Sequence, residues 1–126
     1  MSTSVRDLIA WQQAMDLVEM LYKLTAKFPR EEIYGLTSQA RRAAVSVASN
    51  IAEGQGRNST KEFVQFLGMA HGSLIELETQ VLIARRLKYV EQQDMDEVVK
   101  QIERVRRLIN GLMQSFQKGK AASGGA

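Results

Sequence analysis

The residues best suited to phosphate chemistry lie in one stretch, SNIAEGQGRNSTKEF at 49–63. It holds Gly54 and Gly56, followed closely by Arg57 and Lys61. A P-loop needs a strand, the pattern G-x-x-x-x-G-K-[ST] and a helix, because its lysine and hydroxyl must reach phosphate and magnesium. Here a helical pattern precedes the glycines, and the lysine is displaced. The stretch therefore predicts a turn, although Arg57 and Lys61 beside a helix N-terminus suit an anion such as a backbone phosphate.

Local structure accounts for the same residues without a ligand. Gly54 or Gly56 is expected to end the preceding helix in the left-handed conformation. Ser59 and Glu62 have the spacing of a capping box, which opens the next helix. This interpretation is favoured over the phosphate site.

A polar stripe is the second candidate. Residues three or four apart share one helix face, and the stripe has two parts with this spacing: Gln39, Arg42, Ser46, Asn50 and Glu53, then Ser73, Glu76 and Gln80. Three interpretations stay open: a solvated face, a catalytic set, or a partly buried network. In the network, Arg42 pairs with Glu53 or Glu76 between helices or between subunits.

Metal and nucleophilic chemistry lack the residues that they need. The chain has no cysteine and a single histidine, His71. Di-iron bundles use Glu-x-x-His pairs, but Gly68 stands three residues before His71. No nucleophile elbow surrounds this histidine. The sequence thus predicts no catalytic residues, no metal site, no cofactor and no enzymatic activity.

The elements that would position these residues are helices. A single proline, Pro29, interrupts the chain, and the regular apolar spacing is helical rather than strand-like. Helices are expected at about 5–28, capped by Ser4, at 38–53, capped by Thr37, at 60–89 and at 95–118. The prediction is all-α, an antiparallel up-down four-helix bundle. Its parts are a flexible N-terminus (1–4), the bundle (5–118) and a disordered tail (119–126).

Length and composition limit the setting. The chain of 126 residues, 44% of them apolar, can bury one core of ordinary size. The absence of cysteine fits a reducing compartment. The N-terminus lacks a signal-peptide core, and no apolar run approaches the roughly 20 residues that span a bilayer. A cytoplasmic protein without a membrane partner is expected.

The basic residues are concentrated in the middle of the chain. The net charge is +3, which permits binding to a polyanion without requiring it. The middle excess comprises Arg41, Arg42, Arg57, Lys61, Arg85, Arg86 and Lys88. Only 6% of residues are aromatic, and the core is expected to use most of them. A stacking platform for single strands is therefore not indicated.

Other features point to close helix packing and self-association. The second helix is rich in alanine and serine, and Gly68 and Gly72 lie inside the third, where each costs roughly 1 kcal/mol relative to alanine. A close crossing, within the bundle or between subunits, would offset that cost. The first helix has two adjoining apolar stripes, one of which includes Trp11, more than a single bundle seam requires.

Four segments resemble proteins encoded in intervening sequences of bacterial 23S rRNA genes. They are LIAWQQAM at 8–15, YGLTSQARRAAVSVASNIAEGQGR at 34–57, EFVQFLGMAHGSLIELETQ at 62–80 and LINGLMQSF at 108–116. The most specific parts are residues 50–54 with 56–57, and residues 72–77. The chain departs from the family at His71, where arginine or another polar residue is expected.

The resemblance implies a non-enzymatic bundle that assembles into homopentamers. A similar fold occurs in the accessory protein of diversity-generating retroelements, a basic pentamer that associates with nucleic acid and a reverse transcriptase. We therefore expect an oligomer that binds RNA or DNA, with a protein-interaction scaffold for a partner enzyme, such as a reverse transcriptase, as the alternative. The expected nucleic-acid contacts are Arg41, Arg42, Arg57, Lys61, Arg85 and Arg86. The expected interface or polar-network residues are Trp11, Arg42, Ser46, Asn50, Glu53, Ser73 and Glu76.

Overall fold

Four long helices make up most of the chain. The computed structural model describes residue 5 and residues 8–124, with side chains as far as Gln117. The elements are α1 (Ile9–Thr25), a short 3-10 helix η2 (Arg30–Glu32), α2 (Leu36–Gln55), α3 (Thr60–Arg86) and α4 (Gln92–Gly124). The described residues form no strand. The predicted all-α fold with four helices is confirmed.

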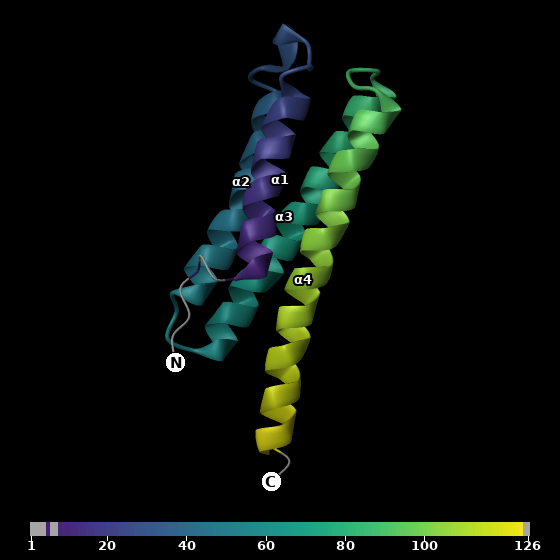
Figure 1. Ribbon diagram of the computed structural model, residues 1–126. Helices are drawn as coiled ribbons and strands as arrows, with labels where there is room; N and C mark the ends of the chain where they lie inside the picture. The colour runs from purple at the N-terminus through teal and green to yellow at the C-terminus, as the bar shows by residue number, and fades with distance from the viewer. Residues whose placement is uncertain (1–4, 6–7, 125–126) are drawn as a thin grey trace.

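The connections lie at alternating ends of the helices (Figure 1). The connection between α1 and α2 and that between α3 and α4 lie at one end, which we call the two-joint end (residues 26–35 and 87–91). The connection between α2 and α3 lies at the opposite end. Near the two-joint end, Lys27 Nζ, just after α1, lies 2.6 Å from Asp94 Oδ2 in the first turn of α4. Nearer the start of α1, the Gln13 carbonyl accepts a hydrogen bond at 2.9 Å from Gln101 Nε2, further along α4.

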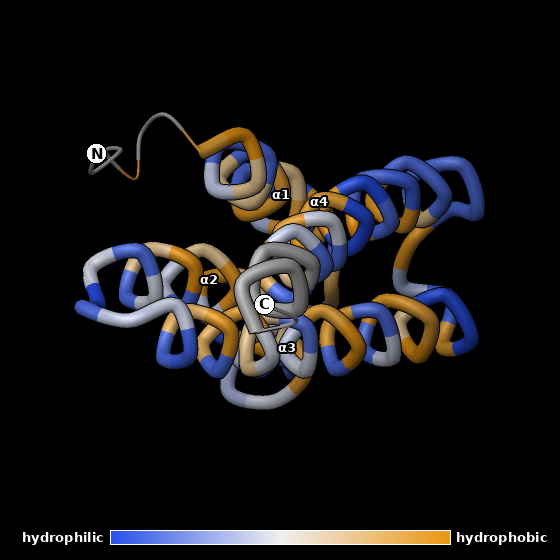
Figure 2. Tube along the Cα trace, turned by 90° about the horizontal axis from the view of Figure 1, so that it is seen from below, coloured by the Kyte–Doolittle hydropathy of each residue, from blue (hydrophilic) through white to orange (hydrophobic). Residues whose placement is uncertain are grey.

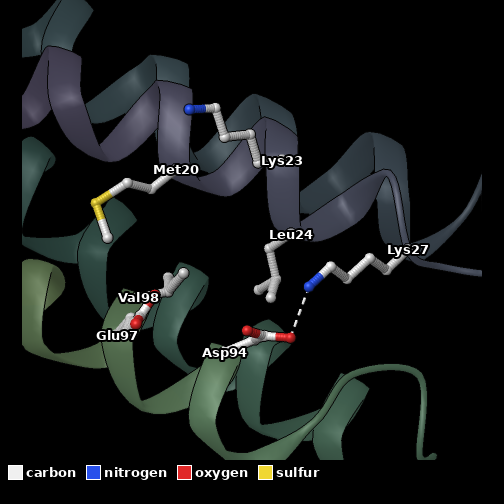
Figure 3. Close-up of a pocket in the computed structure, with 7 residues that line it drawn as sticks. All are labelled: Met20, Lys23, Leu24, Lys27, Asp94, Glu97 and Val98. Atoms are coloured by element: carbon white, nitrogen blue, oxygen red, sulfur yellow. Dashed lines mark hydrogen bonds and ion pairs between the residues drawn. The ribbon is translucent and has the colours of Figure 1, made fainter.

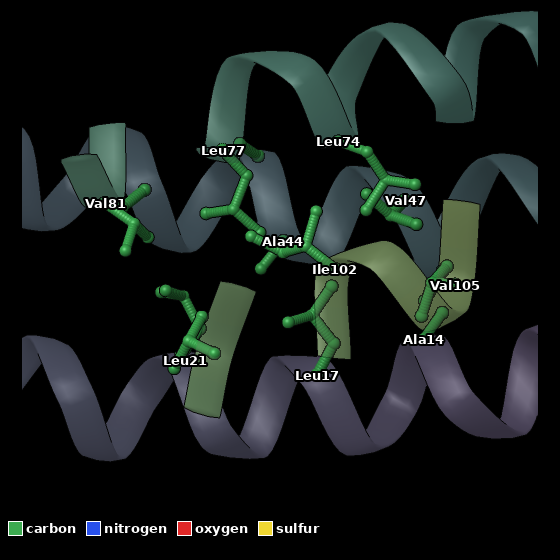
Figure 4. Packing of buried hydrophobic residues seen from close by; sticks show 14 of the residues in the cluster. Ala14, Leu17, Leu21, Ala44, Val47, Leu74, Leu77, Val81, Ile102 and Val105 are labelled. Atoms are coloured by element: carbon green, nitrogen blue, oxygen red, sulfur yellow. The ribbon is translucent and has the colours of Figure 1, made fainter. Parts of the chain in front are cut away.

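The core runs along the inner faces of all four helices. Polar and apolar residues alternate in short blocks along each helix (Figure 2), as expected for amphipathic helices. Side chains from each helix meet in the middle of the bundle (Figure 4), among them Leu17, Val47, Leu74 and Ile102. The predicted α3 seam is buried throughout: Phe63, Leu67, Ala70, Leu74, Leu77, Val81 and Ala84.

The two apolar stripes of α1 have different surroundings. One stripe faces the core and is buried: Ala14, Leu17, Leu21, Leu24 and Phe28. The other lies largely outside the core, since Trp11 and Val18 are half-buried while Met15 and Tyr22 are exposed. The first helix therefore carries more apolar surface than its own bundle covers.

Several helix ends differ from the predicted ones. The cap predicted at Ser4 lies outside the described residues, and α1 begins at Ile9. Thr37 does not cap α2, because α2 begins at Leu36 and Gly35 occupies the N-cap position. The Glu32 carboxylate accepts a hydrogen bond from the Leu36 amide (3.1 Å) instead. α3 ends at Arg86, and Lys88 just after it has the positive φ of 65°. The left-handed turn thus follows α3.

The joint between α2 and α3 is partly as predicted. Ser59 Oγ accepts a hydrogen bond from the Glu62 amide at 3.2 Å, so the cap of α3 is confirmed. The prediction that a glycine in the left-handed conformation ends α2 is wrong. Gly56 has φ −79°, and neither Gly54 nor Gly56 has a positive φ. Gly54 lies inside α2 instead.

The C-terminal helix is longer than predicted. α4 begins at Gln92 rather than Met95 and stays helical to Gly124, past the end expected near Lys118. The flexible segment predicted for 1–4 lies outside the described residues. The disordered tail predicted for 119–126 stays a prediction.

A hydrogen bond fastens the two connections at the two-joint end. Tyr89 Oη donates to Glu32 Oε2 at 2.7 Å, and the Tyr89 ring packs against Phe28 with 5.7 Å between centroids. Gly35 makes room for the carboxylate, since a Cβ there would lie 2.7 Å from Glu32 Oε1. The phenol hydrogen bond, followed by that from the Leu36 amide, lowers the pKa of Glu32, and the same carboxylate raises the pKa of Tyr89.

Replacing Tyr89 with phenylalanine is expected to lower the melting temperature at neutral pH. Because the folded pKa of Glu32 is below its ordinary value of 4.5, its contribution to stability is complete above that value. That contribution is lost as pH falls through the folded pKa, so the melting temperatures of variant and wild type should converge in acid. Thermal unfolding from pH 2 to 7 measures this, and a difference independent of pH would contradict it.

Candidate functional site

The glycine-containing joint is built for helix packing. A Cβ at Gly54 would lie 2.8 Å from Phe63 Cδ1 and 2.8 Å from Phe66 Cβ, so only glycine lets α2 approach α3 here. The Arg57 guanidinium lies over the Phe66 ring, 4.7 Å from its centroid. The joint therefore holds two helices together, which agrees with the predicted turn.

Two of the six predicted nucleic-acid contacts donate side-chain hydrogen bonds within the chain. Arg41 Nε donates to Thr25 Oγ1 at 2.8 Å, and its guanidinium lies 4.5 Å from the centroid of the Tyr22 ring. Arg85 Nε donates to Gln92 Oε1 at 3.3 Å. Both arginines are half-buried. They are less available to a ligand than the other four.

The other four basic residues are exposed and form two groups. Arg42, near the start of α2, and Arg86, at the end of α3, lie toward the two-joint end, whereas Arg57 and Lys61 lie at the α2–α3 joint. α2 is 20 residues long, about 30 Å at 1.5 Å per residue. The structure therefore does not bring the predicted contacts into one cluster. Arg42, Lys61 and Arg86 have no partner within the described residues.

The middle of the predicted polar stripe forms a network between α2 and α3. Ser46 Oγ lies 3.0 Å from Ser73 Oγ, and the Asn50 amide donates to both the carbonyl and the hydroxyl of Ser46. Further along α3, Gln80 Nε2 donates to Glu76 Oε1 at 3.1 Å, while Gln80 Oε1 is buried without a hydrogen bond from any of the described residues. Of these contacts, the Ser46–Ser73 hydrogen bond joins the two helices and helps to set their register, whereas the others lie within α2 or within α3.

The charged residues Arg42 and Glu53 of the stripe are not part of this network in the described chain. Glu53 Oε2 lies 3.9 Å from Arg57 Nη2, and Arg42 pairs with neither Glu53 nor Glu76 among the described residues. The pairing predicted between helices of one chain is therefore not formed. Pairing across subunits stays a prediction.

Replacing Glu53 with alanine is expected to cost less than about 1 kcal/mol in a single chain, because exposed ion pairs contribute little. Its side chain is 58% exposed, and its contact with Arg57 is long. Urea unfolding at concentrations where light scattering reports monomers would measure this loss. A loss of several kcal/mol under those conditions would mean that Glu53 is desolvated in the chain itself.

The outer face of α3 was not recognised from the sequence as a surface. We define it as Gly68, Gly72, Ile75, Thr79 and Leu82, all exposed and spaced three or four residues apart. A Cβ added at either glycine would meet no neighbouring atom within 4 Å in the part of the chain that the structure describes. The close crossing predicted for Gly68 and Gly72 therefore does not occur within the bundle. The signal was present in the sequence, because this spacing runs opposite the buried seam.

Two shallow depressions lie on the opposite side of the bundle, between α1 and α4. One, of about 260 Å³, is lined by Met20, Lys23, Leu24, Lys27, Asp94, Glu97 and Val98 (Figure 3). The ion pair between Lys27 and Asp94 crosses it. The other, of about 420 Å³, is mostly apolar and lies between the start of α1 and residues 107–112. None of the predicted site residues lines either depression.

The described part of the chain holds neither a metal-binding cluster nor a membrane-spanning helix. No three or more His, Cys, Asp or Glu side chains lie close enough there to hold a metal ion. Within the same residues, no helix has the length and apolar character needed to cross a membrane.

Comparison with known proteins identifies the family. The chain resembles a crystal structure of a protein with unknown function from the S23 ribosomal protein family of Bacteroides thetaiotaomicron, with a TM-score of 0.75 and 16% sequence identity. That match covers 83% of this chain and 98% of the other, and at this identity it shows the fold alone. No curated protein matches the chain. The model of the 23S rRNA-intervening sequence protein family matches residues 6–111, and the chain therefore belongs to this family.

Proposed function

We propose that this protein is a non-enzymatic, cytoplasmic nucleic-acid-binding module that works as a homo-oligomer. The observation that carries the proposal is the set of exposed cations without partners in the described chain, Arg42, Lys61 and Arg86, on the α2–α3 side of the bundle. No existing ion pair has to break when such cations meet phosphate. Arg57 adds a fourth exposed charge, although its guanidinium is shared with Glu53.

Contacts of this kind are with the phosphate backbone, so they give affinity with little sequence preference. Arg41 and Arg85 would have to leave Thr25 and Gln92 to take part. We therefore assign the main contacts to Arg42, Arg57, Lys61 and Arg86. Their separation into two groups suits a long ligand that follows the α2–α3 pair better than a small anion.

The fold proposed for this module is the antiparallel up-down order, with five chains in a ring as the family resemblance implies. Two separate apolar surfaces support self-association: the outer face of α3, and the α1 stripe of Trp11, Met15, Val18 and Tyr22. When two different surfaces of one chain meet head to tail, the contact repeats and can close into a ring. Open space above Gly68 and Gly72 leaves room for a helix of the next chain.

Replacing Arg42, Lys61 and Arg86 together with alanine is expected to weaken binding to duplex RNA and to flatten its salt dependence. Removing one phosphate contact reduces the slope of log K against log salt by about 0.9 for a B-form duplex, and we expect a similar reduction for RNA. Filter binding between about 50 and 200 mM salt measures both quantities. Replacement of Lys23, Lys100 and Arg107, exposed cations on α1 and α4, removes the same number of charges and is the matched control.

The binding measurements distinguish three outcomes. Loss of affinity in the triple variant with an unchanged control supports the proposal. If the wild type binds neither structured rRNA nor duplex DNA at about 50 mM salt, where phosphate contacts are strong, the proposal is wrong. A protein partner that survives nuclease treatment in a pulldown, together with no nucleic-acid binding, would favour the scaffold alternative.

A further inference from the structure

The two-joint end carries a surface that the charge pattern did not reveal. Tyr34 is 95% exposed there, and Ile33 and Leu87 are each more than half exposed. These residues come from different connections, Ile33 and Tyr34 from the one before α2 and Leu87 from the one after α3. Figure 1 shows both connections at the same end. Tyr34 is an aromatic side chain that the core does not use, although the sequence did not indicate a stacking platform.

Tyr34 lies on a part of the chain that is held in place. Glu32, two residues earlier, accepts hydrogen bonds from Tyr89 Oη and from the Leu36 amide, and so joins the neighbouring connection to the start of α2. The Gly35 amide donates to the Glu32 carbonyl at 2.9 Å. With 95% of its surface exposed, the Tyr34 ring has both faces free. It is an aromatic platform on a fixed turn.

Three cations lie at the same end of the bundle as Tyr34. Arg30, Arg86 and Lys88 lie in or beside the two connections, all exposed and without a partner in the described part of the chain. Leu87 and Lys88 directly precede Tyr89, whose hydroxyl lies 2.7 Å from Glu32 Oε2. Of the acidic neighbours, Glu32 is engaged by that hydrogen bond, while Glu31 and Glu91 are exposed. The three carboxylates and the three cations balance across the two connections as a whole. The end of α3 and the connection after it are positive, because Arg86 and Lys88 are opposed there by Glu91 alone.

We propose that the two-joint end binds single-stranded nucleic acid, with Tyr34 stacking on an unpaired base and Arg86 and Lys88 contacting the phosphates beside it. This inference rests on the proposed function and narrows the ligand to single-stranded nucleic acid. Aromatic rings stack on any base, whereas cations hold the backbone. A duplex cannot use the ring, because its bases are already stacked. Single-stranded loops, bulges or ends are therefore the ligand class for this surface.

The test compares three variants of Tyr34 on two RNAs. Fluorescence anisotropy with a labelled single-stranded RNA of about 12 nucleotides, within the site sizes typical of single-strand binders, and with the same sequence as a duplex gives the two affinities for the full-length protein. Tyr34→Ala should weaken single-strand binding by about 10-fold or more, the size of one base stack. It should leave duplex binding unchanged. Tyr34→Phe should keep single-strand binding, and Tyr34→Leu, which has similar bulk without a ring, should lose it.

Each outcome decides the matter. Equal single-strand affinities for Tyr34→Leu and Tyr34→Phe would overturn the inference, because an apolar contact without a ring is typical of a protein partner. Binding by the wild type that Tyr34→Ala does not change would also overturn it, and would leave the phosphate contacts of α2 and α3 as the proposed function. If the wild type binds neither RNA, both the inference and the proposed function are wrong.

Discussion

Replacing Gly54 with valine is expected to lower the free energy of unfolding by about 2–3 kcal/mol, the cost of overpacking a well-filled contact. Even the Cβ of alanine would lie 2.8 Å from Phe63 Cδ1 and from Phe66 Cβ. The Phe66 Cβ is attached directly to the backbone of α3, so it can move only if the helix moves. Valine adds two methyl groups to the same contact.

Gly54→Ala should show a smaller loss than Gly54→Val. Alanine favours a helix over glycine by about 1 kcal/mol, which offsets part of the steric cost. Urea unfolding of both variants and of Gly72→Ala makes the comparison. Gly72 has open space above it in the single chain, so Gly72→Ala should gain about 1 kcal/mol through helix propensity alone.

The sign of the change is the decisive result. A loss at residue 54 and a gain at residue 72 would mean that the first glycine serves the bundle and that the second does not. Equal effects at the two positions would contradict the close approach of α2 to α3. A Gly72→Ala chain that is more stable as a monomer but assembles less well would place Gly72 at a subunit contact.

The fold was predictable because burial follows the apolar spacing. The seam predicted in α3, from Phe63 to Ala84, is buried along its whole length. The Ser59 cap was also predictable, since its hydrogen bond to the Glu62 amide depends only on local spacing. These features are set by residues a few positions apart in the chain.

Features that depend on contacts between distant segments were not predictable. Glu32 caps α2 and accepts a hydrogen bond from Tyr89, 57 residues away, and no local pattern marks that pairing. The role of Gly54 depends on Phe63 and Phe66 in the next helix, so the expectation of a left-handed cap was reasonable from spacing and wrong.

The positions of the basic residues in the sequence predicted the candidate site only in part. The six basic residues fall in the middle of the chain, between residues 41 and 86, but folding places them at the two opposite ends of α2 and α3. Arg41 and Arg85 also donate hydrogen bonds within the chain. Arg42, Lys61 and Arg86 differ from the other three because their side chains have no partner among the described residues. That property belongs to the folded chain.

Leu74 and Ile75 are adjacent in α3, but we expect their replacement with alanine to have opposite effects on stability and assembly. Leu74 is fully buried in the core, whereas Ile75, the next residue, is 51% exposed. Leu74→Ala should lower the free energy of unfolding by about 2–5 kcal/mol, because it removes apolar contacts and leaves a cavity. Ile75→Ala should change the stability of the single chain by about 0.5 kcal/mol or less, as for other exposed positions.

For assembly we expect the opposite, with a larger effect of Ile75→Ala than of Leu74→Ala. Ile75 lies beside Gly72 on the proposed subunit contact, so Ile75→Ala should dissociate the oligomer at protein concentrations where the wild type stays assembled. Light scattering over a dilution series, with Leu74→Ala measured well below its unfolding temperature, compares the two variants directly. A wild type that is monomeric throughout would contradict the homo-oligomer. An assembled wild type matched by an equally assembled Ile75→Ala would instead exclude Ile75 from the few residues that carry most of the binding energy of a subunit contact.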